Sequence, residues 1–295
     1  MENKLNIDIK TNKPTVYVSK KKEGKKSKLL VHLILIIGAI IMIVPFIWMI
    51  LTAFKTVSET TQLDPFVIFP SEWRFNAFES VIKQMNFLRL YWNTIALIFW
   101  RVFFSLLTAT MAGYAFARLN FKGKNIAFTL VLVQMMIPSQ IFIIPQYQIV
   151  SKLGLLNTTF ALVFPGIVTA FGTFLLRQAF MGLPKELEEA ARLDGCNIGQ
   201  TFLHVMLPLV KSSLVALGIF TALFAFKDLM WPLIVNTEQN TMPLAAALAK
   251  LQGQFATNYP ELMAASVLAC IPMVIIYIIF QKQFIQGIAT SGGKL

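Results

Sequence analysis

Long blocks of apolar residues, joined by short polar segments, run along most of the chain. A helix that crosses a lipid bilayer needs about 20 largely apolar residues, and six blocks reach roughly that length. Inside hydrocarbon, a helix satisfies its own backbone hydrogen bonds. The pattern therefore predicts an all-α polytopic membrane protein. Its six predicted transmembrane helices lie at residues 29–51, 93–117, 126–147, 159–180, 209–230 and 262–280.

Some positions within these blocks indicate bending or close packing. Ala109, Gly113 and Ala117 recur at four-residue spacing, so one face of the second helix carries only small side chains and lets another helix approach closely. Proline lacks a backbone donor and favours a kink. The prolines within the third, fourth and sixth blocks are Pro138, Pro145, Pro165 and Pro272.

Composition and charge agree with a membrane location. Hydrophobic residues make up 56% of the chain and charged residues 14%, and much of the net charge of +12 comes from lysines in residues 1–28. Lysine and arginine are concentrated in cytoplasmic segments of membrane proteins. We therefore expect the N-terminus, and after six crossings the C-terminus, to be cytoplasmic, with membrane lipid and no nucleic acid as a partner. The first block is too long for a signal peptide, so it is expected to remain as an anchor.

The polar segments divide the chain into parts. Thr52 opens a long loop that contains a predicted short amphipathic helix at residues 78–90. The expected parts are a Lys-rich cytoplasmic tail at 1–28, a first transmembrane helix at 29–51, an extracytoplasmic loop at 52–88, a membrane domain at 89–281 with a polar loop at 183–208, and a cytoplasmic C-terminal tail at 282–295.

The polar loop carries the signals of two short helices. Pro184 suits a first helical turn, and the glutamates at 186, 188 and 189 favour the early turns because of the helix dipole. Gly195 suits the residue that ends the first helix. Asn197 is a good cap for a second helix that we expect to run to His204. Such a helix–turn–helix would form a docking surface beside the membrane.

The same loop carries a spaced motif. Glu-Ala-Ala at 189–191 is followed by three residues, Gly195, nine residues, and an aliphatic residue, one further residue and Leu-Pro at 205–208. This pattern resembles the EAA loop of ABC-importer permease subunits, with Val205 in place of the usual isoleucine. Trp92-Asn93-Thr94 is similar to the start of that family's transmembrane domain. Residues 226–232 and 280–295 resemble the carbohydrate-uptake branch related to maltose and multiple-sugar importers, although Lys227-Asp228 replaces that branch's Trp-Asn pair.

The resemblance implies a type I ABC importer transmembrane domain in a bacterial cytoplasmic (inner) membrane. The implied partners are a second homologous permease, two ATPase subunits, and an extracytoplasmic solute-binding protein that delivers a sugar. Closure of the ATPases on ATP would pull the loops together and turn the cavity from inward- to outward-facing. The residues implied to couple the loop to the ATPase are Glu189, Ala190, Ala191, Asp194, Gly195, Leu207 and Pro208.

The chain has no pattern for chemistry of its own. Gly292-Gly293-Lys294 lacks the first glycine and the hydroxyl residue of a P-loop. His32 and His204 lie far apart in the sequence, and two cysteines alone make no metal site. We therefore expect a transport subunit and not an enzyme, with no catalytic residues, metal or cofactor, and with ATP and Mg used by the partner ATPase.

Polar residues inside the predicted helices are candidates for the solute path, because ionisable groups there are costly and usually functional. An aspartate at 228 could accept bonds from sugar hydroxyls while an aromatic ring packs on the sugar face. Alternatively, Lys227, Asp228 and Trp231 form an interfacial anchor and Arg101 bonds helices together. The candidates are Arg101, Gln134, Gln140, Asp228 and Trp231.

These features lead to one preferred function, import of a sugar or oligosaccharide. A close alternative is import of a glycerophosphate or another polyol-phosphate, in which Arg101 would meet the anion. A self-contained secondary transporter or channel is the alternative of a different class. It lacks support from a charge relay or a filter-like sequence, and it does not account for the EAA pattern.

Overall fold

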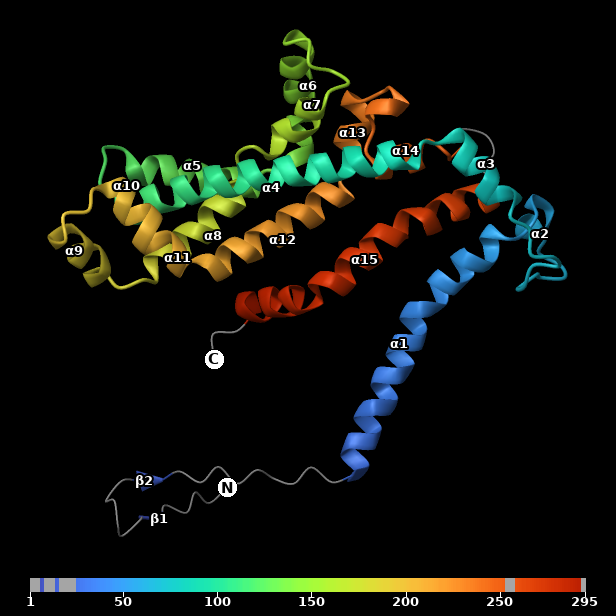
Figure 1. Cartoon of the computed structure of the whole chain (residues 1–295), viewed down its shortest axis with the longest axis horizontal. Helices are drawn as coiled ribbons and strands as arrows, with labels where there is room; N and C mark the ends of the chain where they lie inside the picture. The colour runs from blue at the N-terminus through green and yellow to red at the C-terminus, as the bar shows by residue number, and fades with distance from the viewer. Residues whose placement is uncertain (1–5, 8–13, 16–24, 253–257, 293–295) are drawn as a thin grey trace. The chain divides into compact units, whose positions relative to one another are not determined.

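The computed structural model describes residues 6–7, 14–15, 25–252 and 258–292 (Figure 1). The chain divides into two units, residues 1–48 and 49–295, which are described separately. In the first unit, strands β1 (Asn6–Ile7) and β2 (Pro14–Thr15) form a short antiparallel pair, and helix α1 (Lys25–Ala53) begins. The large apolar side chains of α1 between Leu29 and Val44 are exposed, as in a helix that faces lipid.

All the regular secondary structure among the described residues of the second unit is helical. It contains the last residues of α1 and a series of straight, bent and short helices (Figure 1). These are α2 (Val57–Thr61), α3 (Asn76–Gln84), α4 (Phe87–Arg118), α5 (Lys124–Met136), η1 (Ser139–Phe142), α6 (Ile143–Lys152), α7 (Thr159–Val163), η2 (Phe164–Gly166), α8 (Ala170–Met181), α9 (Glu186–Leu193), α10 (Ile198–Gln200), η3 (Thr201–Met206), α11 (Leu207–Leu209), α12 (Lys211–Lys227), α13 (Met230–Val235), η4 (Gln239–Thr241), α14 (Leu244–Ala249) and α15 (Tyr259–Gly292).

Three helical segments among the described residues are long and apolar enough to cross a membrane unaided: Leu29–Ala53, Phe87–Arg118 and Tyr259–Ile279. Three further pairs of helices pass the same test together but are bent at a short break. If each bent pair is one crossing, the number of spans reaches the six expected from the apolar blocks.

Prolines account for some of these bends. Ile137 and Pro138 separate α5 from η1 and α6, and the helices on either side are bent by 102°. Pro145 lies in the first turn of α6, where its missing N–H costs nothing. Pro165 lies in η2, and the helices on either side are bent by 48°. Pro272, where a kink was expected, lies inside α15, which continues through it as one helix.

The predicted amphipathic helix at 78–90 is wrong in its extent. Helix α3 ends at Gln84, and α4 begins at Phe87, before the predicted second span. The Asn86 side chain accepts a hydrogen bond from the Arg89 N–H at 3.1 Å and caps α4. Asn86, which the prediction placed inside one amphipathic helix, therefore marks the start of α4.

Helix α4 is the central element, and it packs against α8 and α12 (Figure 1). The small-residue face predicted on α4 is confirmed. A Cβ atom added at Gly113 would lie 2.9 Å from the backbone nitrogen of Arg177 in α8. One turn away, a Cβ added at Gly172 of α8 would lie 3.0 Å from the Ala109 Cβ. The two backbones therefore approach as closely as small residues allow.

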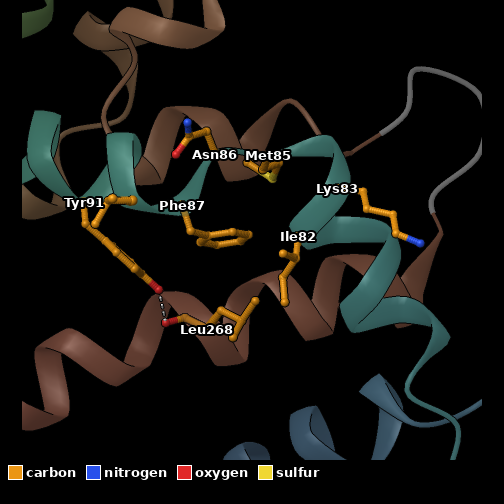
Figure 2. Close-up of a pocket in the computed structure, with 8 residues that line it drawn as sticks. Ile82, Lys83, Met85, Asn86, Phe87, Tyr91 and Leu268 are labelled. Carbon is orange, nitrogen blue, oxygen red and sulfur yellow. Dashed lines mark hydrogen bonds between the residues drawn. The ribbon is translucent and has the colours of Figure 1, made fainter.

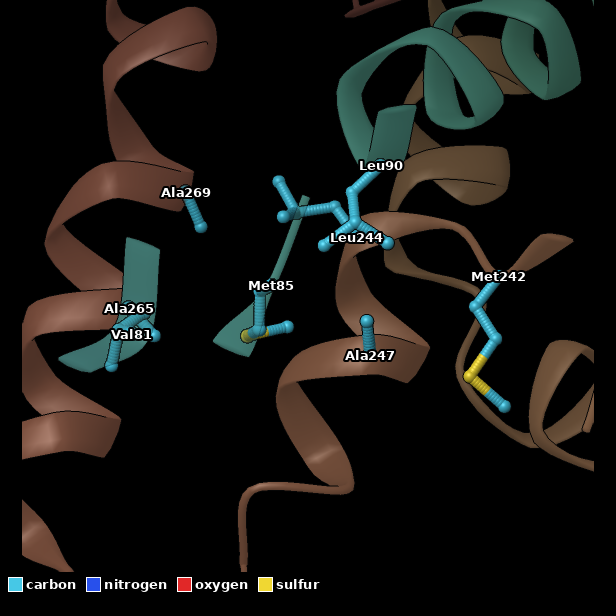
Figure 3. Packing of buried hydrophobic residues seen from close by; sticks show 8 residues of the cluster. All are labelled: Val81, Met85, Leu90, Met242, Leu244, Ala247, Ala265 and Ala269. Atoms are coloured by element: carbon cyan, nitrogen blue, oxygen red, sulfur yellow. The ribbon is translucent and has the colours of Figure 1, made fainter. Parts of the chain in front are cut away.

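A second buried cluster joins the other end of α4 to α3, α14 and α15 (Figure 3). The buried members, labelled in Figure 3, are Val81, Met85, Leu90, Met242, Leu244, Ala247, Ala265 and Ala269. Beside it, the Tyr91 hydroxyl donates to the Leu268 carbonyl at 2.9 Å, at the edge of an open pocket of about 600 Å³ that Phe87 and Ile82 also line (Figure 2). These contacts hold α15 against the α3–α4 corner.

Candidate functional site: the polar loop and the intramembrane pocket

The first helix of the polar loop, α9, forms as its residues predict. Pro184 lies just before it, and the Lys185 carbonyl accepts from the N–H groups of Glu188 and Glu189 at 3.0 and 3.2 Å. Gly195 ends the helix with φ +84°, a conformation that costs glycine little. The Cys196 N–H then donates to the Ala191 carbonyl at 2.9 Å, five residues back, which is the closing bond of a Schellman motif.

The second helix begins as predicted but ends later. Asn197 and Gln200 form a capping box, in which each side chain accepts from the other residue's N–H at 2.9 Å. The expected end at His204 is wrong, because a π-helical turn, η3, continues the helix to Leu209. In that turn the Leu207 N–H donates to Phe202, five residues back, so the chain reaches Pro208 without breaking.

The residues implied to couple the loop differ in exposure. Glu189, Ala190, Asp194, Gly195 and Pro208 are exposed, Leu207 is half-buried and Ala191 is buried. Leu193, which the motif does not include, is 89% exposed next to them. Leu193 thus adds an apolar side chain to the exposed surface of α9 beside the motif residues. Leu193 could have been identified from the sequence as an apolar residue near the end of a mostly polar helix.

A buried ion pair attaches α9 to the end of α4. The Glu188 Oε1 lies 3.4 Å from the Arg118 Nε, and both side chains are at least nine-tenths buried. These two atoms are close enough for an ion pair but make no hydrogen bond. The Arg118 Nη2 donates to the carbonyls of Phe180 and Leu183 at 2.6 and 2.5 Å, so the same guanidinium also holds the end of α8.

Aromatic rings pack beneath this ion pair. Tyr114 of α4 contacts Phe180 of α8 with ring centroids 5.5 Å apart, and Phe202 of η3 with centroids 4.9 Å apart. These packed rings and the Arg118–Glu188 pair join both helices of the loop to the α4–α8 pair. Sequence reasoning missed Arg118 and Glu188 as a unit. The sequence signal for a buried Glu188 was its spacing: it lies three residues before Ala191, so the two share one face of α9. In the structure that face is buried.

A second candidate site is a pocket of about 340 Å³ where the bend after α5 meets the junction of α12 and α13. It brings together three of the five residues proposed for the solute path, Gln140, Asp228 and Trp231. Ser139, Gln146 and Lys227 add further polar groups to its wall. Gln134 is exposed on α5 and does not line this pocket.

Arg101 lies behind the pocket wall. Its Nη2 is 2.7 Å from the Asp228 Oδ2, and its Nε and Nη2 both donate to the Leu162 carbonyl, at 3.0 and 2.7 Å. Gly166 leaves room for the arginine, since a Cβ there would lie 3.0 Å from the Arg101 Cδ. The guanidinium thus bonds α4 to α7 and to Asp228, the residue that follows α12. This agrees with the alternative that Arg101 bonds helices together.

Trp231 is also bonded to α7. Its Nε1–H donates to the Ala161 carbonyl at 2.8 Å, and the side chain is almost fully buried. In an unbroken helix that carbonyl would accept from residue 165, but Pro165 has no N–H to donate. The indole replaces the missing donor. Arg101 and Trp231 therefore satisfy two adjacent carbonyls of α7 while Asp228 and the edge of Trp231 line the pocket.

Comparison with known proteins places these features in a family. Residues 105–290 match the family described as "Binding-protein-dependent transport system inner membrane component". The chain is 38% identical to the arabinooligosaccharides transport system permease protein AraQ of Halalkalibacterium halodurans, over 87% of this chain and 92% of that protein. It is 28% identical to the lactose transport system permease protein LacG of Rhizobium radiobacter, over 88% and 93% of the two chains.

Two further similarities bear on substrate and fold. The sn-glycerol-3-phosphate transport system permease protein UgpE of Salmonella typhi is 34% identical over 61% of this chain and 65% of its own. A solved chain from a bacterial ABC transporter involved in the import of the acidic polysaccharide alginate superposes with a TM-score of 0.73. It is 23% identical and covers 88% of this chain and 98% of its own. The fold is therefore that of an ABC importer permease.

Proposed function

The chain belongs to the inner membrane components of binding-protein-dependent transport systems, and we propose that it forms half of the solute path in an ATP-driven sugar importer. A second permease would supply the other half, two ATPase subunits the energy, and an external binding protein the solute. The observation that supports this most directly is the polar loop, whose motif residues are exposed while its helices are fastened to α4 and α8.

The polar loop is built so that a force from a bound ATPase can reach the membrane helices. Glu189 and Leu193 are free to contact an ATPase, while Glu188 and Ala191 on the opposite face are buried against the membrane domain. A push on the exposed face reaches α4 and α8 through packed side chains, because close-packed interiors transmit strain. This arrangement supports docking of the loop on a cytoplasmic ATPase, and with it a cytoplasmic location of both termini. ATP and Mg would be bound by that ATPase.

The intramembrane pocket supports a hydroxylated solute. Gln140, Gln146 and Ser139 offer amide and hydroxyl groups, which can both donate to and accept from sugar hydroxyls. The Asp228 carboxylate, held by Arg101, adds an acceptor. Sugar and oligosaccharide import is therefore the preferred function, in agreement with the arabinooligosaccharide and lactose transport for which AraQ and LacG are named.

One observation favours the polyol-phosphate alternative. Lys227 lines the pocket, and its ammonium makes no ion pair with any described residue, whereas the charge of Asp228 is already matched by Arg101. An unmatched cation in the wall suits an anionic solute. The relative UgpE, a permease protein of an sn-glycerol-3-phosphate transport system, gives this alternative a precedent among similar proteins.

Uptake measurements in cells that express the whole importer test both proposals. We expect accumulation of labelled arabinooligosaccharide or lactose, and its loss when the partner ATPase genes are deleted. Uptake that persists without any ATPase would refute the importer subunit and favour a secondary transporter or channel.

Substitution of Lys227 separates the two solute classes. Lys227→Gln should leave uptake of a neutral sugar unchanged, and should lower uptake of glycerol-3-phosphate at least tenfold if the anion is the substrate. Lys211→Gln, an exposed lysine at the opposite end of α12, is the matched control. Equal effects of both variants would show that Lys227 does not meet the solute.

A further inference from the structure

The segment at residues 62–75, here called the aromatic loop, has polar contacts turned inward and apolar side chains turned outward. It connects α2 to α3, just after the end of α1. This is the reverse of the usual arrangement in a soluble loop, where the apolar side chains form the inner face.

The inward contacts hold the loop in a defined shape. The Lys55 Nζ donates to the Val67 carbonyl at 2.7 Å, and that lysine is only 4% exposed. The Glu59 carboxylate accepts from the backbone N–H of Ser71 at 2.9 Å and from that of Thr56 at 2.7 Å. Hydrogen bonds from the Ser71 side chain, and from the Thr56 and Ser71 backbones, lower the pKa of Glu59 to about 2. Burial lowers the pKa of Lys55.

The outward side chains are large and apolar. Leu63 is 84% exposed and Phe69 is 68% exposed, although Pro70 beside it is buried. The other exposed members are Phe66, Ile68, Trp73 and Phe75. Lys55 and Glu59 bond the loop backbone at Val67 and Ser71, and Phe69 lies between these two positions with its side chain exposed.

The loop is fastened at the point where α1 ends. Phe54, the residue directly after α1, contacts the rings of Trp73 and Phe75, each with centroids 5.1 Å apart. The charges of Glu72 and Arg74 in the loop are matched to each other at 2.8 Å. The exposed apolar side chains thus lie close to the end of a helix that is long and apolar enough to cross a membrane.

We propose that the aromatic loop inserts its apolar side chains into the boundary between headgroups and acyl chains where α1 leaves the membrane. Tryptophan and other aromatic rings concentrate at this depth, and an apolar surface gains free energy by leaving water there. The paired Glu72 and Arg74 lie at the level where headgroups accept polar groups. The occupant of this surface is phospholipid, and the loop fixes the depth and rotation of the α1 exit.

Depth-dependent quenching tests the proposal in the assembled importer. The complex is placed in phosphatidylcholine nanodiscs, with Cys196 and Cys270 replaced by serine and alanine. A bimane label at Phe69→Cys should lose at least half of its emission when a nitroxide-labelled phosphatidylcholine is included. A label at Thr61→Cys in α2, exposed and on a polar helix, is the matched control and should lose much less.

Two outcomes would overturn the proposal. The Phe69 label could be quenched by aqueous iodide and not by the nitroxide lipid, which would place it in water. It could instead be shielded from both quenchers only when the second permease or the binding protein is present, which would make the loop a protein interface. A label at Leu63→Cys gives an independent reading if Phe69→Cys does not assemble. The proposal does not depend on which solute is transported.

Discussion

Arg118, at the end of α4, lies 3.4 Å from Glu188 of α9, measured from Nε to Oε1, with both side chains buried. The glutamate belongs to the polar loop and the arginine to the central membrane helix. Two segments far apart in the sequence are thus joined by opposite charges away from water. Removing one charge leaves the other buried and uncompensated, which is far more costly than removing both.

Glu188→Ala should therefore destabilise the protein by about 3–5 kcal/mol. The measurement is thermal unfolding of the purified complex in detergent, together with the amount of permease in the membrane. Glu186→Ala, on the exposed face of the same helix, is the control and should change neither quantity. Arg118 also bonds the carbonyls of Phe180 and Leu183, so the ion pair is isolated by a double-mutant cycle. The double variant Arg118→Met with Glu188→Met should be less destabilised than the sum of its two single variants, and simple additivity would contradict the ion-pair explanation.

Gly113 gives a prediction about helix packing. Gly113→Ala places a Cβ 2.9 Å from the backbone of α8, so α4 and α8 must separate, at a cost of about 1–3 kcal/mol. Gly218→Ala is the matched control, because its Cβ would meet side chains of α4 only at 3.8 Å, an ordinary contact. A lower unfolding temperature for the Gly218 variant than for the Gly113 variant would refute the packing argument.

Glu189 gives a prediction about coupling. Its side chain is exposed and makes no ion pair with any described residue, so Glu189→Ala should leave stability and membrane level unchanged. If Glu189 contacts the ATPase, the same variant should lower solute uptake at least tenfold. Glu186→Ala again serves as control, with normal uptake. Normal uptake in the Glu189 variant would show that the motif glutamate does not couple this loop.

Much of the fold follows from local properties of the sequence. The apolar blocks, the small face on α4, the caps at Asn197 and the positive φ of Gly195 are set by residues close to one another in the chain. The bends could be placed only in part, because prolines within the apolar blocks have different effects at different positions. Pro138 ends a helix, whereas α15 continues through Pro272.

The sites were less accessible to sequence reasoning, since they depend on contacts between distant segments. Arg101 and Asp228 were recognised separately as costly charges, but their pairing requires the arrangement of α4, α7 and α12. The pocket at Asp228 also depends on the turn after α5, which brings Gln140 there and leaves Gln134 outside. Whether these residues contact solute stays a prediction.

The bond from Trp231 to Ala161 gives a prediction for the broken fourth span. Trp231→Phe keeps the ring but removes the donor, and Pro165 cannot replace it, so the Ala161 carbonyl loses its partner. We expect destabilisation of about 1–3 kcal/mol, the cost of an unsatisfied buried polar group. Trp100→Phe, at an exposed tryptophan of α4, should change the unfolding temperature much less.

Glu59 gives a prediction about acid. Because its folded pKa is lowered from 4.5 to about 2, its bonds stabilise the aromatic loop fully above pH 4.5. That contribution is lost as pH falls through about 2, when the carboxylate is protonated. Emission of a bimane label at Phe69→Cys should therefore change between these pH values. Glu59→Gln should remove this transition, and an identical titration in that variant would assign it to another group.

The bonds of Arg101 join segments that are synthesised at different times. The Leu162 carbonyl that receives the guanidinium lies 61 residues further along the chain, and Asp228 is made later still. When α4 first enters the bilayer during synthesis, its arginine has neither partner, and water or lipid headgroups must solvate the charge. Both partners of Arg101 are therefore present only once α7 and the end of α12 have been synthesised. Of these three helices α4 is made first, yet its buried charge is the last to gain its protein partners.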